Sequence, residues 1–85
     1  MSDKTFNVDI SVWRMGDYAD FFAAGNKNDF LGQFELIAKV IKSWPYAEAG
    51  DPSTAEAYRN LSVTEWQECL SKVGEAIAAQ FQRGN

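Results

Sequence analysis

The chain has 85 residues, of which 46% are apolar and 14% aromatic against 24% charged. This composition is that of a folded globular chain and argues against disorder, so we expect one domain over residues 1–85 with frayed ends at 1–4 and 82–85. Twelve acidic residues against eight basic ones give a net charge of −4. Without a basic stripe to neutralise phosphates, DNA and RNA are not expected as partners.

The first predicted element is a β-strand over residues 5–12, where apolar and polar side chains alternate. The alternation places Phe6, Val8, Ile10 and Val12 on one face. A strand must pair its backbone groups, and the sequence contains no second alternating segment. We therefore expect the partner strand in another copy or another protein, which makes Phe6, Val8 and Ile10 candidates for self-association. The alternative is an extended arm packed along the helices.

A first helix is predicted from about Met15 to Ala24. Its aromatic residues, Tyr18, Phe21 and Phe22, recur at spacings of three and four, as on one face of a helix. Gly25 follows, where a left-handed C-terminal cap is expected.

A second helix is predicted from Asp29 to Trp44. Asn28 or Asp29 can cap its first turn, and Pro45 ends it because proline lacks an N–H and disfavours helical geometry in the preceding residue. Its apolar stripe consists of Phe30, Phe34, Ile37, Ile41 and Trp44 and is widened by Leu31, Ala38 and Val40.

A loop over residues 45–51 and two further helices complete the predicted elements. Asp51 and Pro52 supply an N-cap and a proline at the first helical position, which predicts a short helix over 52–59. Ser62 and Glu65 form a capping box, so the final helix should begin at Val63. Leu61 and Trp66 occupy the positions of a hydrophobic staple, and the buried stripe of this helix comprises Val63, Trp66, Leu70, Val73, Ile77 and Phe81.

These elements predict a mainly α fold, a small helical domain of three to four helices with one short N-terminal β-strand or extended arm. No apolar run approaches the ~20 residues that span a bilayer, and no charged-then-apolar leader begins the chain. We expect a cytoplasmic protein. The single cysteine, Cys69, is expected to pack as a small apolar residue or to lie at a helix edge.

The chemistry of a catalytic site is not evident in the sequence. The chain has no histidine, so acid–base catalysis would need a carboxylate or lysine strongly tuned by burial, such as Asp17 or Glu35 at a pocket. Carboxylate pairs three residues apart, Asp17 with Asp20 and Glu65 with Glu68, are typical of a solvated helix surface. No enzyme, no cofactor and no metal site is expected.

Aromatic side chains are the candidates for binding a partner. Trp44 lies on a helical apolar stripe and fits the core better than a contact surface, whereas Trp13 either fills the core or anchors a partner. Tyr46 and Tyr58 flank the Pro/Gly loop, where they can pack together or form an exposed patch. The partner-binding candidates are Trp13, Phe22, Trp44, Tyr46 and Tyr58.

The order of these features resembles a known family. The chain has an Asn-Asp-Phe start to the second helix, Trp-Pro-Tyr at 44–46, Gly-Asp-Pro at 50–52 and Tyr-x-x-Leu at 58–61 before a last helix that contains tryptophan. Over residues 8–81 this pattern is similar to that of small tail assembly chaperones of long-tailed, siphovirus-like bacteriophages. The resemblance implies a protein of the host cytoplasm that binds the tail tape measure protein, keeps it soluble and helps to recruit tail tube protein. The family often also makes a longer product by translational frameshifting.

Three other interpretations differ in class. A small acidic phage-encoded inhibitor or adaptor that binds a host or defence protein predicts a tight one-to-one complex. A structural virion subunit of the tail or head predicts ring-shaped oligomers retained in the particle. An enzyme or enzyme subunit would require a buried carboxylate with a shifted pKa at a pocket.

Overall fold

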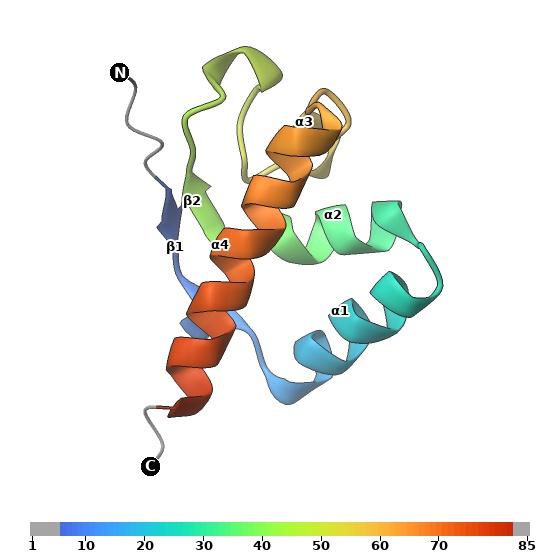
Figure 1. Cartoon of the computed structure of the whole chain (residues 1–85), viewed down its shortest axis with the longest axis vertical. Coiled ribbons are helices and arrows are strands. Elements are labelled where there is room, and N and C mark those ends of the chain that lie inside the picture. Colours follow the sequence, from blue (N-terminus) through green and yellow to red (C-terminus); the bar gives the residue numbers. More distant parts are fainter. Residues whose placement is uncertain (1–5, 83–85) are drawn as a thin grey trace.

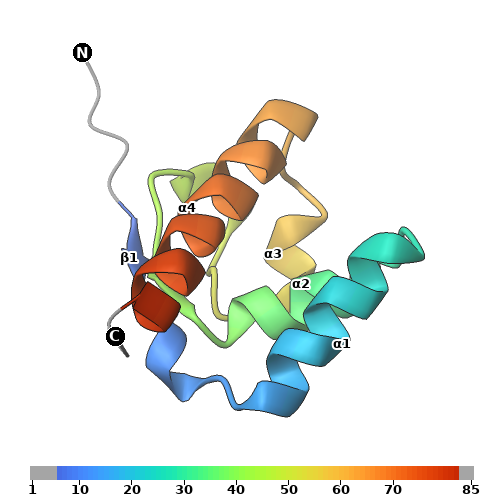
Figure 2. The same ribbon diagram turned by 60° about the horizontal axis from the view of Figure 1, so that its bottom comes forward.

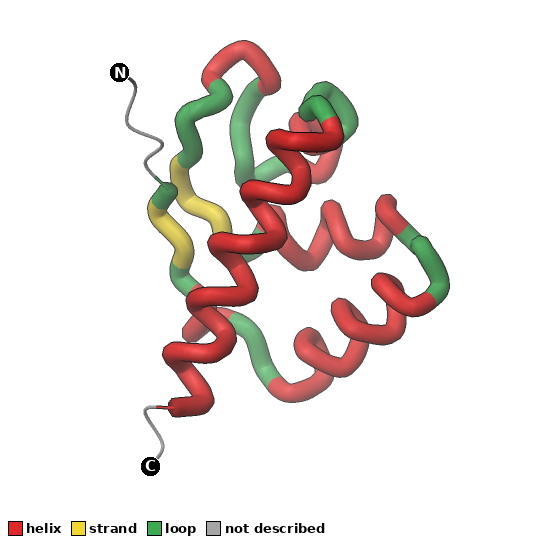
Figure 3. Tube along the Cα trace, in the orientation of Figure 1, coloured by secondary structure: helices red, strands yellow, loops and turns green. Residues whose placement is uncertain are grey.

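A computed structural model describes residues 6–82. Within that range the chain forms four α-helices, two 3-10 turns and a two-stranded antiparallel sheet, which confirms the predicted mainly α fold (Figures 1 and 3). The expected frayed segments 1–4 and 83–85 lie outside the described residues, whereas Gln82 belongs to the last helix. The elements follow in the order β1 (Asn7–Val8), the 3-10 turn Ile10–Val12, α1 (Met15–Asn26), α2 (Phe30–Ala38), β2 (Ile41–Ser43), the 3-10 turn Ala47–Ala49, α3 (Ala55–Tyr58) and α4 (Val63–Gln82).

The N-terminal strand is shorter than predicted and pairs within its own chain. Asn7 lies opposite Ser43, and Val8 lies opposite Ile41. The strand ends because the carboxylate of Asp9 accepts a hydrogen bond from the backbone N–H of Ser11 at 3.2 Å, which starts a 3-10 turn. The expectation that another chain supplies the partner strand is therefore wrong.

The partner strand β2 lies where the sequence predicted the second half of a helix. α2 ends at Ala38, six residues before Trp44. Its last turn tightens through i→i−3 hydrogen bonds, and Val40 and Ile41 are then completely buried. The carbonyl of Val40 also accepts from the N–H of Asp9 at 2.8 Å. Two buried β-branched residues and pairing with β1 outweigh the helical periodicity, so Pro45 is not the helix stop.

A short turn over residues 27–29 joins α1 to α2. The prediction of a left-handed cap at Gly25 is wrong: α1 continues to Asn26, and Asn28 is the residue with positive φ, at 59°. The N–H of Asn28 donates to the carbonyl of Gly25 and the N–H of Asp29 donates to that of Ala24, which is a Schellman motif. Asp29 then caps α2 through its carboxylate, which accepts from the N–H of Gly32 at 3.1 Å.

The starts of the two C-terminal helices differ in how well they follow the prediction. α4 begins at Val63 as expected, because the hydroxyl of Ser62 accepts from the N–H of Glu65 at 3.1 Å and the Glu65 carboxylate accepts from the N–H of Ser62 at 2.9 Å. α3 begins at Ala55, three residues later than Pro52. The Asp51 carboxylate accepts from both the N–H and the hydroxyl of Ser53, and this turn takes the place of the predicted first helical turn.

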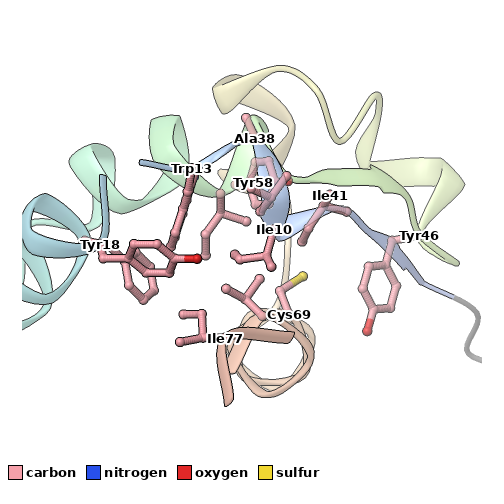
Figure 4. Close-up of a cluster of buried hydrophobic side chains, with 13 residues drawn as sticks. Ile10, Trp13, Tyr18, Ala38, Ile41, Tyr46, Tyr58, Cys69 and Ile77 are labelled. Atoms are coloured by element: carbon pink, nitrogen blue, oxygen red, sulfur yellow. The ribbon is translucent and has the colours of Figure 1, made fainter. Parts of the chain in front are cut away.

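The core lies between α4 and the layer formed by the sheet and α2. In Figure 4, Cys69 and Ile77 of α4 point toward Ile10 and Ile41. Cys69 is completely buried, which confirms its predicted packing as a small apolar residue. Burial raises the pKa of its thiol to about 12. Figure 2 shows α1 and α2 on one side of the molecule, with α4 crossing the other.

Candidate functional site

An open groove lies where α2, α3 and the first half of α4 meet, and we call it the apolar groove. Its volume is about 790 Å³. Apolar side chains dominate its lining, and the charged group among the lining residues is the guanidinium of Arg59. The lining residues are Phe30, Leu31, Phe34, Tyr58, Arg59, Leu61, Ser62, Val63, Trp66, Gln67 and Leu70.

Three aromatic rings from three different helices form the floor of the apolar groove. The ring of Phe34 stacks on Tyr58 with centroids 5.9 Å apart and meets Trp66 edge-to-face at 5.0 Å. Tyr58 and Trp66 are 6.3 Å apart, also edge-to-face. These mutual contacts hold the rings in place, so the floor is formed before any partner arrives.

The rim of the apolar groove carries large apolar side chains that the fold leaves in water. Phe30 is 51% exposed, Leu31 56% and Val63 73%. Single exposed apolar residues are ordinary on a protein surface. Three of them around one concave, apolar-lined surface form the kind of patch that marks an interaction site.

Two helix caps position this rim. The Asp29 cap starts α2 at Phe30, so Phe30 and Leu31 lie in its first turn, beyond the point where the helix meets the core. The Ser62 capping box starts α4 at Val63, which places Val63 at the mouth of the groove and Trp66 one turn deeper. The local signals that define both helix starts therefore also build the groove.

The structure places most of the predicted partner-binding aromatics in the core. Trp13 is buried, and its indole N–H donates to the carbonyl of Leu36 at 3.0 Å. Tyr46 is buried with its hydroxyl on the carboxylate of Glu68, and half-buried Trp44 lies against both Tyr46 and Tyr58. Packing and hydrogen bonding within the chain already use most of the surface of Trp13 and Tyr46, while Trp44 keeps part of its ring exposed, so a role of these residues in binding a partner stays a prediction.

The two remaining candidates for binding a partner, Tyr58 and Phe22, lie in different places. Tyr58 is buried, yet one side of it contributes to the groove floor. Phe22 is 53% exposed on α1 and does not line the apolar groove. Its role in binding a partner stays a prediction.

The three residues predicted to self-associate face the chain's own core. Ile10 is buried, and Phe6 and Val8 are half-buried and packed against the core cluster. The ring of Phe6 also meets that of Tyr46 edge-to-face at 5.7 Å. The apolar side of the strand is therefore largely covered from within, and self-association through these side chains stays a prediction.

Sequence reasoning missed the groove because it assigned Phe30, Val63 and Trp66 to buried stripes. A signal was present in the position of Phe30 and Leu31 in the first turn of the helix, since residues at the end of a helix can extend beyond the core that covers its middle. Val63 had a similar signal. It is the first residue of its helix, one turn beyond the stretch of α4 that the core covers.

Neither Asp17 nor Glu35, the carboxylates considered for a catalytic role, is buried. Asp17 accepts from the N–H of Arg14 at 2.9 Å and forms an ion pair with Lys39 at 3.6 Å, while Glu35 is exposed.

Two tyrosines have raised pKa values. Burial, followed by the hydrogen bond to Glu68, raises the pKa of Tyr46, and burial raises the pKa of Tyr58. Both phenols are neutral at physiological pH.

No group of three or more His, Cys, Asp or Glu side chains in residues 6–82 could hold a metal ion. Among the helices of that range, none combines the length and the apolarity needed to cross a bilayer. Comparison of the chain with protein-family models, with curated proteins and with solved structures found no match.

Proposed function

We propose that this chain is a non-catalytic binding protein whose apolar groove holds an amphipathic helix of another protein. The observation that carries the proposal is the exposure of Phe30, Leu31 and Val63 around a floor that is already packed. Covering these side chains removes apolar surface from water, at roughly 25 cal/mol per Å². A helix that enters the groove would gain this free energy without first reorganising the site.

A helix suits the shape and chemistry of this surface. Helix-in-groove recognition uses apolar anchors at positions i, i+3, i+4 and i+7, which form one stripe along the bound helix. The groove offers apolar surface between α2 and α4, with three aromatic rings at its floor and Phe30, Leu31 and Val63 at its rim. Binding of this kind keeps an apolar helix from aggregating, which is the work of a chaperone.

In its specific form, the proposal is that the protein acts as a tail assembly chaperone of a long-tailed bacteriophage in the host cytoplasm. Its partner would be the tail tape measure protein, a long chain with many apolar helices, and it would help to recruit tail tube protein. This form rests on the resemblance in the aromatic and turn residues described above. The groove supports the more general part, the binding of a helix.

The test is co-expression with helical fragments of the tape measure protein, followed by light-scattering mass of the soluble fraction. We expect a soluble complex containing several copies of the chain on a fragment that precipitates alone. Leu31→Asp places a charge on the groove rim and should leave the fragment insoluble. Met15→Asp is the matched control, because Met15 is 67% exposed but lies on α1, away from the groove.

Two results would contradict the proposal. If the unaltered protein stays monomeric and the fragment stays insoluble, the chaperone function is wrong, and an inhibitor of a folded target becomes the better interpretation. If Leu31→Asp solubilises the fragment as well as the unaltered chain does, the groove is not the binding surface.

A further inference from the structure

A second recess adjoins the apolar groove at its α2–α3 end. It has a volume of about 450 Å³ and is lined by Leu31, Glu35, Ala55, Glu56 and Arg59. Leu31 and Arg59 line both hollows, so the apolar groove and this acidic recess form one continuous surface. A helix that lies in the groove can therefore reach the recess with side chains along one edge.

The charges of the acidic recess are not balanced by ion pairs. Glu35 of α2 and Glu56 of α3 are both exposed. Within residues 6–82 neither carboxylate has an ion-pair partner within 4.0 Å; the pairs found there are Asp17 with Lys39 and Lys72 with Glu75. Arg59 shares the recess and offsets one of the two negative charges, which leaves a local excess of one in a chain of net charge −4.

We propose that the helix bound by the apolar groove is amphipathic and basic, with a lysine or arginine at the edge of its apolar stripe that enters the acidic recess. This inference rests on the proposed function and names the chemistry of its partner. Leu31 and Ala55 offer an apolar wall for the aliphatic part of such a side chain, while Glu35 and Glu56 flank its charged end. The negative field of the whole chain also steers a basic segment toward the surface.

The first test uses two synthetic helical peptides of about 18 residues, or five turns, with identical leucine stripes. One peptide carries lysines along both edges of the stripe, and the other carries glutamates. We expect the lysine peptide to bind the purified protein about tenfold more tightly at low salt, because exposed ion pairs add up to ~1 kcal/mol each. The preference should shrink in 1 M NaCl, where the screening length falls to about 3 Å.

The second test assigns that preference to the recess. The double substitution Glu35→Gln and Glu56→Gln should weaken binding of the lysine peptide about fivefold. Glu48→Gln with Glu75→Gln changes the net charge equally at exposed positions that line neither hollow, and should change the affinity less than about twofold. All four side chains are exposed, and circular dichroism should show unchanged folding.

The outcomes separate this inference from the proposed function. If both peptides bind equally well and Leu31→Asp weakens both, the groove binds helices but the basic preference is wrong. If the two double variants weaken binding of the lysine peptide equally, the net charge of the protein, and not the recess, causes the preference for the lysine peptide. This result also overturns the inference. If neither peptide binds the unaltered protein, the groove itself is not a helix-binding site, and both proposals fall together.

Discussion

The hydroxyl of Tyr58 donates a hydrogen bond to the carbonyl oxygen of Pro52 across 2.7 Å, and both residues are buried. The bond joins the end of α3 to the loop that precedes it. Two further side chains hold the same loop: the indole N–H of Trp44 donates to the carbonyl of Gly50, and the amide of Asn60 donates to that of Ala49. Residues 50–52 therefore have a defined conformation although they form no regular helix or strand.

Replacing Tyr58 with phenylalanine removes this bond and leaves the buried Pro52 carbonyl without its donor. We expect the free energy of unfolding to fall by about 1–3 kcal/mol, the usual cost of an unsatisfied buried polar group. Urea denaturation measures the difference. Tyr18→Phe is the matched control, because Tyr18 is also buried and its hydroxyl has no hydrogen bond to residues 6–82; an equal loss in both variants would contradict the role of the Tyr58 bond.

The pH dependence of stability should follow three buried acids. Burial raises the pKa of Cys69 from 9.0 to about 12, and the pKa values of Tyr46 and Tyr58 also lie above their usual value of 10.0. A raised pKa means that the fold favours the protonated, neutral form. The stability that this preference contributes is therefore complete below pH 9. It is lost as the pH rises from about 9 through the pKa values of the folded state.

Two measurements check this behaviour. Thermal melts should give a constant melting temperature from pH 7 to about 9 and a falling one above it, and Cys69 in the folded protein should react with a thiol reagent at pH 8 only after denaturant is added. A thiol that reacts at once in the native protein would show that Cys69 is accessible and would contradict its burial.

Ser62→Ala should destabilise the protein by about 1 kcal/mol, since it removes the acceptor for the N–H of Glu65 in the capping box. Thr64→Ala changes an exposed residue of the same helical turn that makes no such cap, and should be close to neutral. Differential scanning calorimetry gives both values. Equal melting temperatures for Ser62→Ala and the unaltered chain would show that the cap does not stabilise α4.

Deletion of residues 1–9 should lower stability and leave the oligomeric mass unchanged. The deletion removes β1, its pairing with Ile41 and Ser43, and the packing of Phe6 and Val8 on the core. Light scattering and a thermal melt of the same sample measure both quantities. A change of oligomeric mass at unchanged stability would restore the idea that this strand joins two copies.

The parts of the fold that the sequence predicted are those set by short-range chemistry. The capping box at Ser62 and Glu65, the start of α2 at Asp29 and the burial of Cys69 each depend on neighbours within one helical turn or on residue type. The errors have a long-range cause. Whether residues 39–44 continue a helix or form a strand depends on β1, more than 30 residues away in the sequence, and helical periodicity does not contain that information.

The candidate site was harder to predict for a related reason. An apolar stripe identifies one face of a helix, but not how far along the helix the core extends. Phe30 and Val63 lie on predicted stripes, and each belongs to the turn of its helix that projects beyond the core. Only the packing of α2 against α3 and α4 decides which stripe residues are covered.

Asp29 serves two helices at once, since its N–H closes the end of α1 and its carboxylate opens α2. A residue inserted between Asn28 and Asp29 would place these two roles on different residues and lengthen the junction. Side chains at position 32 are constrained as well, because a Cβ there would lie 2.6 Å from the Asp29 carboxylate. In homologues that diverge from this chain, insertions and deletions should therefore be excluded between residues 28 and 29, and an alignment should run through this point without a gap.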